Sequence, residues 1–252
     1  MPSTISITSA ALVAVVLSCA APMPARAQML MPTRNEAPQI APPKPLSRTE
    51  LPPVERGERA GTGFFVDDSG HMLTARHVVQ DCSRIVIQKE GRTTSARVVA
   101  LSTPYDLALL RTTRTRGLAA VFPRNVTSSP NDMMFAADYA NLSMMLARGG
   151  VLANASVGMT SGSGEAGHIA LNSTVTFGSS GAPVMDSRGL IEGVVSRKTS
   201  VNRVLAVGSA GAKSFLAASN IRFQENDRPQ IAGSGSRAHR AASISARVIC
   251  LN

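Results

Sequence analysis

Short runs of apolar or alternating residues, separated by turn-forming residues, begin at Gly61 and continue along most of the chain. In the first half they occupy residues 63–66, 72–73, 84–88, 95–100 and 107–111. The sequences Asp-Asp-Ser-Gly at 67–70 and Lys-Glu-Gly-Arg at 89–92 fall between such runs and are typical of hairpin turns. This pattern predicts an antiparallel, all-β unit.

A second group of strand-like runs follows a connection rich in Thr, Arg, Ser and Pro at residues 112–130. The runs occupy residues 133–137, 143–148, 150–157, 168–171, 182–185, 190–196 and 204–206. Residues 212–218 have a helix-forming composition with an apolar face, so one short helix is predicted near the C-terminal end. Residues 224–252 are rich in Gly, Ser, Arg and Ala and are interpreted as a tail.

The first residues have the features of an export signal. An apolar run over residues 10–21 precedes Ala25-Arg26-Ala27, a small-x-small pattern that predicts cleavage before Gln28. The run is too short to span a bilayer, so no stable membrane span is predicted. Lipoprotein processing at Cys19 is the alternative, although Leu17 suits it poorly. We expect a signal peptide at residues 1–27 and a periplasmic or secreted protein.

Residues 28–56 form a proline-rich segment with few large apolar side chains. Such a composition cannot bury enough surface to fold alone and predicts an extended linker.

Two cysteines, Cys82 and Cys250, remain after removal of the signal peptide. A pair in an oxidising compartment favours a disulfide, which would join the tail to the segment that follows His77. Two unrelated thiols are the alternative, because a sequence does not give the distance between them.

The net charge of +10 raises the possibility of nucleic-acid binding. The basic residues are scattered, however, and no aromatic side chains are interleaved with them to stack on bases. We therefore expect no nucleic-acid partner. His71, His168 and His239 lack companion ligands at metal-binding spacing, so neither a metal nor another cofactor is assigned.

Three segments carry candidate chemistry, in the order His, Asp, Ser. His77 follows a strand-like run, where its imidazole can face a cleft. Asp106 directly precedes an apolar strand, where its carboxylate can orient an imidazole. Ser180 lies in Gly178-Ser179-Ser180-Gly181, in which glycine permits a turn that points the amides of Gly178 and Ser180 at a developing oxyanion.

These segments resemble the His, Asp and Ser motifs of chymotrypsin-fold serine proteases, and the nearest likeness is to small bacterial members and the HtrA-type protease domain. The sequence Gly-Thr-Gly-Phe-Phe-Val at 61–66, with Thr-Ala-Arg-His at 74–77, is similar to the first hairpin and His motif of that domain. Arg-Gly-Gly-Val-Leu at 148–152 is similar to its mid-domain strand.

The resemblance implies two six-stranded β-barrels with the site between them and a short C-terminal helix. The protease domain would cover residues 57–223, with one barrel at about 57–117 and the other at about 125–223. It also implies that His77, Asp106 and Ser180 form the catalytic triad, that Ser196 supports Asp106, and that Arg197 and Lys198 lie along the bound substrate.

Departures from the family refine this interpretation. Ser179 replaces the Asp that receives a new N-terminus in zymogen-activated trypsins, so that switch should be absent. Thr174 occupies the position of the acidic residue that gives trypsins their preference for Lys and Arg, which disfavours tryptic cleavage. Arg197 and Lys198 favour acidic or small residues instead. The stretch after Phe223 is too short for a PDZ module.

The sequence therefore predicts an exported serine endopeptidase that acts on protein or peptide substrates through an acyl-enzyme. A protease-fold protein that binds peptides or partners without turnover is the alternative. A surface-binding role of the basic tail is a third, weaker one. The oligomeric state stays open.

Overall fold

The computed structural model describes residues 57–115, 119–125, 132–147, 167–172, 178–200, 202–231 and 236–252. The predicted signal peptide, the proline-rich linker, the strand expected at residues 150–157 and Thr174 lie outside the described residues.

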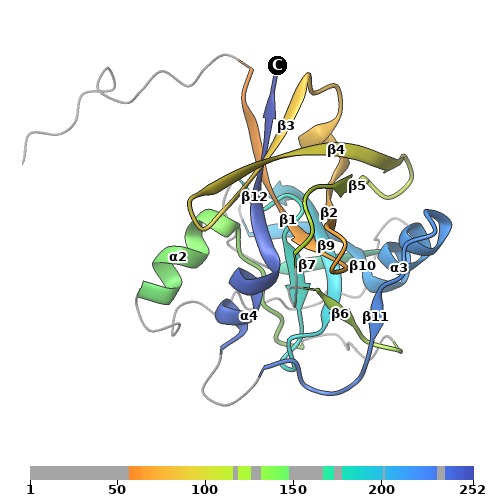
Figure 1. Cartoon of the computed structure of the whole chain (residues 1–252). Coiled ribbons are helices and arrows are strands. Elements are labelled where there is room, and N and C mark those ends of the chain that lie inside the picture. The colour runs from red at the N-terminus through yellow and green to blue at the C-terminus, as the bar shows by residue number, and fades with distance from the viewer. Residues whose placement is uncertain are drawn as a thin grey trace, which may run out of the picture. The chain divides into compact units, whose positions relative to one another are not determined.

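Six strands close into a barrel, in the order β1-β12-β3-β4-β5-β2. Five of them are consecutive in sequence and match the runs predicted for the first half, while β12 comes from the other end of the chain (Figure 1). Their bounds are β1 Arg59–Phe65, β2 His71–Ala75, β3 Arg84–Lys89, β4 Arg92–Ser102, β5 Leu107–Arg111 and β12 Ser245–Leu251. Both predicted hairpin turns join the strands expected.

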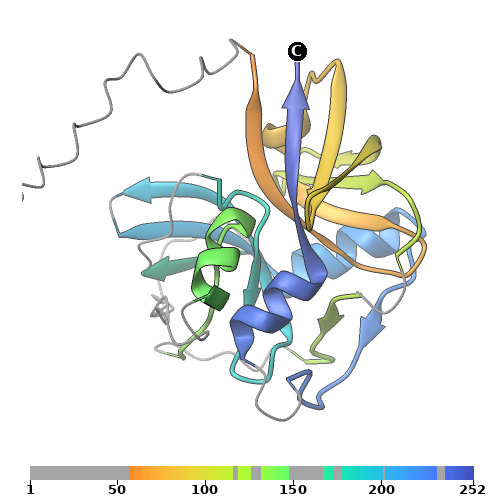
Figure 2. The ribbon, with the colours of Figure 1, turned by 60° about the vertical axis from the view of Figure 1, so that its left-hand side comes forward.

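The strand β12 corrects the prediction that residues 224–252 are a tail. It pairs antiparallel with β1, from Arg59 opposite Cys250 to Phe64 opposite Ser245, and with β3 on its other edge. Figure 2 shows it between these two strands. Ala246, Val248 and Cys250 are buried at alternate positions, the period of a strand with one face in a core. The small and polar residues before it obscured this alternation.

The second half contains a four-stranded sheet in the order β7-β10-β9-β8. Its strands are β7 His168–Asn172, β8 Pro183–Met185, β9 Ile191–Ser200 and β10 Arg203–Gly208, each close to a predicted run. A short parallel pair, β6 Val121–Phe122 with β11 Gln224–Glu225, lies apart from it. Six strands were predicted for a second barrel, and the described residues contain four of them, in this sheet. The run predicted at residues 133–137 forms only an isolated bridge, between Phe135 and Met185.

A helix replaces the strand predicted at residues 143–148. The helix α2, Tyr139–Ala147, buries Leu142 and packs Tyr139, Met145 and Leu146 against the core, a spacing of three to four residues. Asp138 precedes it, and the Asp138 Oδ1 accepts a hydrogen bond from the Asn141 amide at 2.9 Å. An N-cap and a helical period together outweigh the apolar character that suggested a strand.

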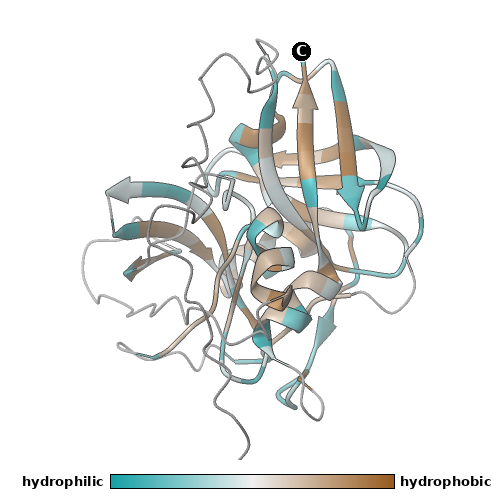
Figure 3. Ribbon diagram, turned by 90° about the vertical axis from the view of Figure 1, so that its left-hand side faces the viewer, coloured by the Kyte–Doolittle hydropathy of each residue, from teal (hydrophilic) through white to brown (hydrophobic). Residues whose placement is uncertain are grey.

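Three further helices complete the described fold: α1 Arg76–Val79, α3 Ser209–Ala218 and α4 Arg237–Ile244. The helix α3 confirms the one predicted at residues 212–218. Figure 3 shows apolar residues on strands of both halves and on the helices. No helix of the described residues is long and apolar enough to cross a membrane.

One core cluster joins the barrel to the sheet. It contains Phe64 and Leu107 from the barrel, Ile191 and Val194 from β9, and Leu216 from α3, all of them buried. Because the two halves share this core, side chains at their common border have fixed neighbours on both sides.

Candidate active site

His77 is the second residue of α1, which begins directly after β2. The end of this short helix is held by Arg59 of β1, whose guanidinium donates to the carbonyl oxygen of His77 at 3.3 Å and also to that of Gln80. Val78 and Val79 point into the barrel core, whereas 49% of the His77 side chain is exposed. The backbone of His77 is thus anchored while its imidazole faces outward.

Asp106 meets the start of α1 with both its backbone and its carboxylate. Its carbonyl oxygen accepts from the Arg76 amide at 2.9 Å, and its Oδ1 accepts from the His77 amide at 3.1 Å. The Oδ2 lies 2.9 Å from His77 Nδ1 and accepts from the Ser196 hydroxyl at 2.6 Å. Asp106 has φ of 49°, a left-handed conformation that Asp adopts more readily than most residues.

The surroundings of Asp106 favour its charged form. Burial raises the pKa of the carboxyl, but the hydrogen bonds from His77 and Ser196 lower it by more, so the pKa lies below its ordinary value. The carboxylate consequently stays ionised and can hold the imidazole with its Nδ1 protonated.

The loop that carries Ser180 folds against β1 and β2. Gly178 and Gly181 have φ of 96° and 84°, which only glycine adopts without strain. A Cβ atom added at Gly181 would lie 2.1 Å from the Thr62 carbonyl oxygen and 2.4 Å from Thr74 Oγ1, so a side chain cannot fit there. Gly61 in turn lies against both Val78 and the Ser180 carbonyl oxygen. The backbone of Ser180 therefore lies next to α1.

Thr62 is a residue that the sequence did not reveal as part of this site. Its amide donates to the Ser180 carbonyl oxygen and its hydroxyl to that of Gly178, both at 2.9 Å. The same hydroxyl accepts from the Tyr139 amide, at the first turn of α2, at 3.0 Å. Thr62 is 1% exposed, so these bonds are shielded from water. The one available signal was its place between two glycines.

In the structure, the carboxylate of Asp106 links the imidazole of His77 to the hydroxyl of Ser196 through two hydrogen bonds. Among the described residues, no hydrogen bond joins the Ser180 hydroxyl to the His77 ring. Such bonds are commonly long before substrate binds.

Cys82 and Cys250 form a disulfide, with their Cα atoms 5.5 Å apart. It joins the residues after α1 to β12, and the Arg59 guanidinium lies within 3.8 Å of both sulfur atoms. The same guanidinium binds the end of α1, so β12 and the helix that carries His77 share one anchor.

Three of the predicted substrate-binding residues, Ser196, Arg197 and Lys198, lie on β9. Ser196 is buried beneath Asp106, while Arg197 and Lys198 are exposed and pair with β10. These two basic residues directly follow Ser196, the residue of β9 that donates to the Asp106 carboxylate.

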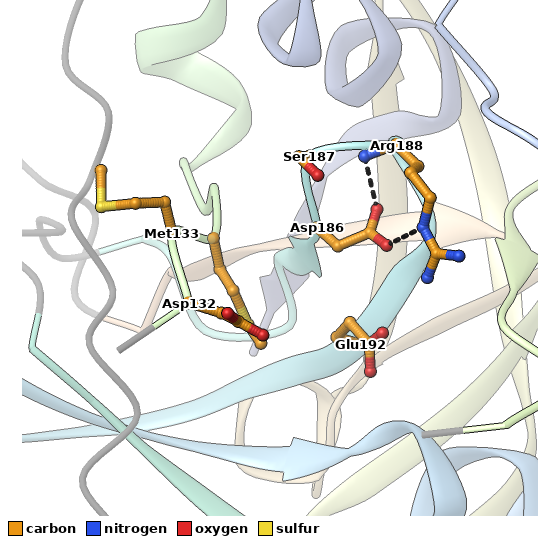
Figure 4. Close-up of a pocket in the computed structure, with 7 residues that line it drawn as sticks. Asp132, Met133, Asp186, Ser187, Arg188 and Glu192 are labelled. Carbon is orange, nitrogen blue, oxygen red and sulfur yellow. Dashed lines mark hydrogen bonds and ion pairs between the residues drawn. The ribbon is translucent and has the colours of Figure 1, made fainter. Parts of the chain in front are cut away.

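A cavity of about 330 Å³ lies elsewhere, at the turn between β8 and β9 (Figure 4). Asp132, Asp186 and Glu192 line it, with Arg188 donating to Asp186. None of the predicted site residues lines this cavity.

The fold is that of the chymotrypsin-like, all-β proteins: a closed barrel and a second sheet share one core. A hydrogen-bonded His–Asp pair and a glycine-flanked serine lie at the border of the two halves. The family model of the trypsin-like peptidase domain matches residues 61–194. This match covers more than half of the chain, which therefore belongs to the trypsin-like peptidase family.

Relatives support the same assignment. An uncharacterised protein, y4bJ of Sinorhizobium fredii, is 32% identical over 225 residues, covering 82% of this chain and 35% of the relative. A probable periplasmic serine endoprotease, DegP-like, of Chlamydia trachomatis is 28% identical over 66% of this chain and 32% of its own length. The chain thus spans about a third of the length of these two relatives.

The solved structure of a serine endoprotease from Yersinia pestis has the same fold, with a TM-score of 0.53. It is 21% identical, and the match covers 63% of this chain and 57% of that one. HtrA-type proteases are also among the solved structures of this fold. The predicted resemblance to HtrA-type domains and the predicted chymotrypsin-like, all-β fold are confirmed.

Proposed function

We propose that this protein is an exported serine endopeptidase in which Ser180 is the nucleophile, His77 the general base and Asp106 the residue that orients His77. The observation that carries the proposal is the carboxylate of Asp106, which lies 2.9 Å from His77 Nδ1 and accepts a second hydrogen bond from Ser196. An ionised carboxylate on one ring nitrogen leaves the other, Nε2, as a proton acceptor.

In the proposed reaction the Ser180 Oγ attacks the carbonyl carbon of a peptide bond while His77 Nε2 takes its proton. The tetrahedral intermediate then loses the amine, which receives that proton from His77, and the acyl group stays on Ser180. Water, deprotonated by His77, attacks the ester and releases the acid, and the proton returns to Ser180.

The oxyanion of this reaction would bind to the amides of Gly178 and Ser180. Support comes from the positive φ of Gly178 and from the two hydrogen bonds by which Thr62 holds the carbonyl groups of the same two residues. A donor fixed before the reaction begins loses no energy to reorganisation when charge develops.

Export is part of the proposal because of the apolar run before Ala27 and because one relative is named a probable periplasmic protease. The mass of the exported chain tests this point, since cleavage as proposed gives a protein that begins at Gln28.

The catalytic proposal is tested with a fluorophosphonate probe, which labels activated serines covalently. We expect labelling of the wild type and of Ser187→Ala, which removes an exposed hydroxyl from the turn between β8 and β9, and its loss in Ser180→Ala. Peptide products from a denatured protein should end in acidic or small residues rather than Lys or Arg. Folded wild-type protein that takes up no label would instead support a peptide-binding protein without turnover.

A further inference from the structure

Tyr105 lies in the turn between β4 and β5, directly before Asp106, and its ring packs against the second half of the molecule. There it lies against Gly167, next to the start of β7, and against Gly211, the third residue of α3. The centroids of the Tyr105 and His168 rings are 6.4 Å apart. The residue that precedes the proposed triad aspartate is thus held by two elements of the second half.

The two glycines make the space that this ring occupies. A Cβ atom added at Gly167 would lie 3.0 Å from Tyr105 Cε1, and one added at Gly211 would lie 3.3 Å from the same atom. Both distances are shorter than an optimal carbon–carbon contact, so a side chain at either position would press on the ring. Tyr105 also packs against the core cluster that joins the barrel to the sheet. Packing of ring carbons therefore fixes the position of this side chain.

The backbone of Asp106 requires support of this kind. Its φ of 49° is a conformation that persists where the surrounding contacts enforce it. On the barrel side its carbonyl oxygen accepts from the Arg76 amide, and from the second half its carboxylate accepts from the Ser196 hydroxyl. The ring of Tyr105 adds another contact between this turn and the second half.

The turn also determines how the two parts of the proposed site meet. His77 and Asp106 belong to the barrel half, whereas Ser180 and Ser196 belong to the second half. The Asp106 Oδ2 lies 2.9 Å from His77 Nδ1 and 2.6 Å from Ser196 Oγ. A displacement of the carboxylate by about 1 Å would break hydrogen bonds of this length.

We propose that Tyr105 is a positioning residue of the proposed reaction: its ring, packed against Gly167 and Gly211, holds the carboxylate of Asp106 where it binds both His77 and Ser196. The inference rests on the proposed function, because it needs a reaction in which Asp106 orients His77. Tyr105 acts through Asp106 rather than on the substrate.

The test compares Tyr105→Ala with Tyr105→Phe, which keeps the ring and removes only the hydroxyl. With a quenched fluorescent peptide as substrate, we expect kcat of Tyr105→Ala to fall by about 10- to 100-fold with little change in KM, because a small misplacement of a catalytic group has an effect of this size. Tyr105→Phe should keep most of the wild-type kcat.

Proton NMR measures the positioning directly. In wild type the proton on His77 Nδ1 should resonate far downfield, because the Asp106 carboxylate accepts it. This resonance should move upfield or disappear in Tyr105→Ala and stay in place in Tyr105→Phe.

The matched control is Phe223→Ala. Phe223 is likewise a partly buried aromatic residue packed against the same core cluster, but its ring contacts Phe122, with the centroids 5.5 Å apart. Urea unfolding should show a loss of stability in this variant, as in Tyr105→Ala, whereas kcat and the downfield resonance should remain those of the wild type.

Gly211→Ala displaces the ring without removing it, and alanine favours the helix. The added methyl group would also lie 3.0 Å from Val207 Cγ1, so it has little room to avoid the ring. We expect kcat to fall by about two- to fivefold, less than in Tyr105→Ala because the ring moves by less.

A folded Tyr105→Ala protein with the wild-type kcat and an unshifted resonance overturns the role of Tyr105, while the probe still labels Ser180 of the wild type. If Tyr105→Ala does not fold, a wild-type kcat in Gly211→Ala overturns it equally. Absence of both cleavage and labelling in the wild type overturns the proposed function, and this inference with it.

Discussion

The two halves of the molecule hold their parts of the site by different means. The barrel holds His77 and Asp106 at the ends of regular strands, within a closed ring of hydrogen bonds. The second half holds Ser180 on an irregular loop, whose shape depends on the positive φ of Gly178 and Gly181. The loop is then fixed from outside, by hydrogen bonds to Thr62 of the barrel.

This difference indicates how each half should fail. Loss of one strand from a closed barrel should unfold the whole barrel, because the edges of its two neighbours are left without a pairing partner. Damage to the contacts of a loop leaves the fold in place and displaces only the groups that the loop presents.

The largest effect is expected from a chain that ends at residue 244 and so lacks β12. It leaves facing edges of β1 and β3 unpaired and exposes the core that Ala246 and Val248 cover. The loss should exceed the whole net stability of a domain, about 5–15 kcal/mol. Urea unfolding followed by circular dichroism should show no cooperative transition.

A variant that lacks only Asn252 is the control for this truncation and should unfold like the wild type. A chain ending at residue 244 that still unfolds cooperatively near the wild-type midpoint would show that the barrel does not need its sixth strand.

A smaller effect, chiefly on activity, is expected from Thr62→Val. The change keeps the shape of the side chain but removes the hydroxyl that donates to Gly178 and accepts from Tyr139. We expect kcat to fall by about 10- to 100-fold, a range set by the loss of oxyanion stabilisation, with little change in KM. Thr62→Ser, which keeps the hydroxyl, should restore most of the rate.

Thr94→Val serves as the matched control, since Thr94 shares its hydroxyl with Thr112 on a half-buried part of β4 away from the loop. The positioning role of Thr62 is wrong if folded Thr62→Val protein keeps the wild-type kcat.

The smallest effect is expected in the pH dependence of stability. Because the pKa of Asp106 is lower in the folded state than its ordinary value, its ionised form stabilises the fold above that ordinary value, about 3.9. This contribution disappears as pH falls through the lower, folded pKa. The difference in unfolding free energy between wild type and Asp106→Asn should therefore be largest near neutral pH and shrink below about pH 4.

A gap for Asp106→Asn that grows as the pH falls would mean that folding raises, rather than lowers, the pKa of this carboxyl.

Much of the fold could be predicted where the alternation was regular. Strands such as β3 and β5 have uninterrupted apolar or alternating positions and turns of clear composition on either side. The helix α2 could not be separated from a strand, because its apolar run is short and its N-cap is visible only once Asp138 bonds Asn141. β12 was missed because a composition of small and basic residues concealed its period of two.

The site divides in the same way. Each of His77, Asp106 and Ser180 could be identified as a candidate site residue from the few residues on either side of it. Thr62 and Arg59 take part through partners far away in sequence, and the residues next to them give no indication of these contacts.

The position of β12 also constrains the order of events during biogenesis. Synthesis proceeds from the N-terminus, so strands β1 to β5 emerge long before residues 245–251, and the barrel stays open between β1 and β3 until then. Contacts between such distant segments form late in folding. A nascent chain that has not yet added β12 lacks Cys250, the disulfide partner of Cys82, and with it part of the support of α1, so the site proposed at His77 is assembled only after β12 has been made.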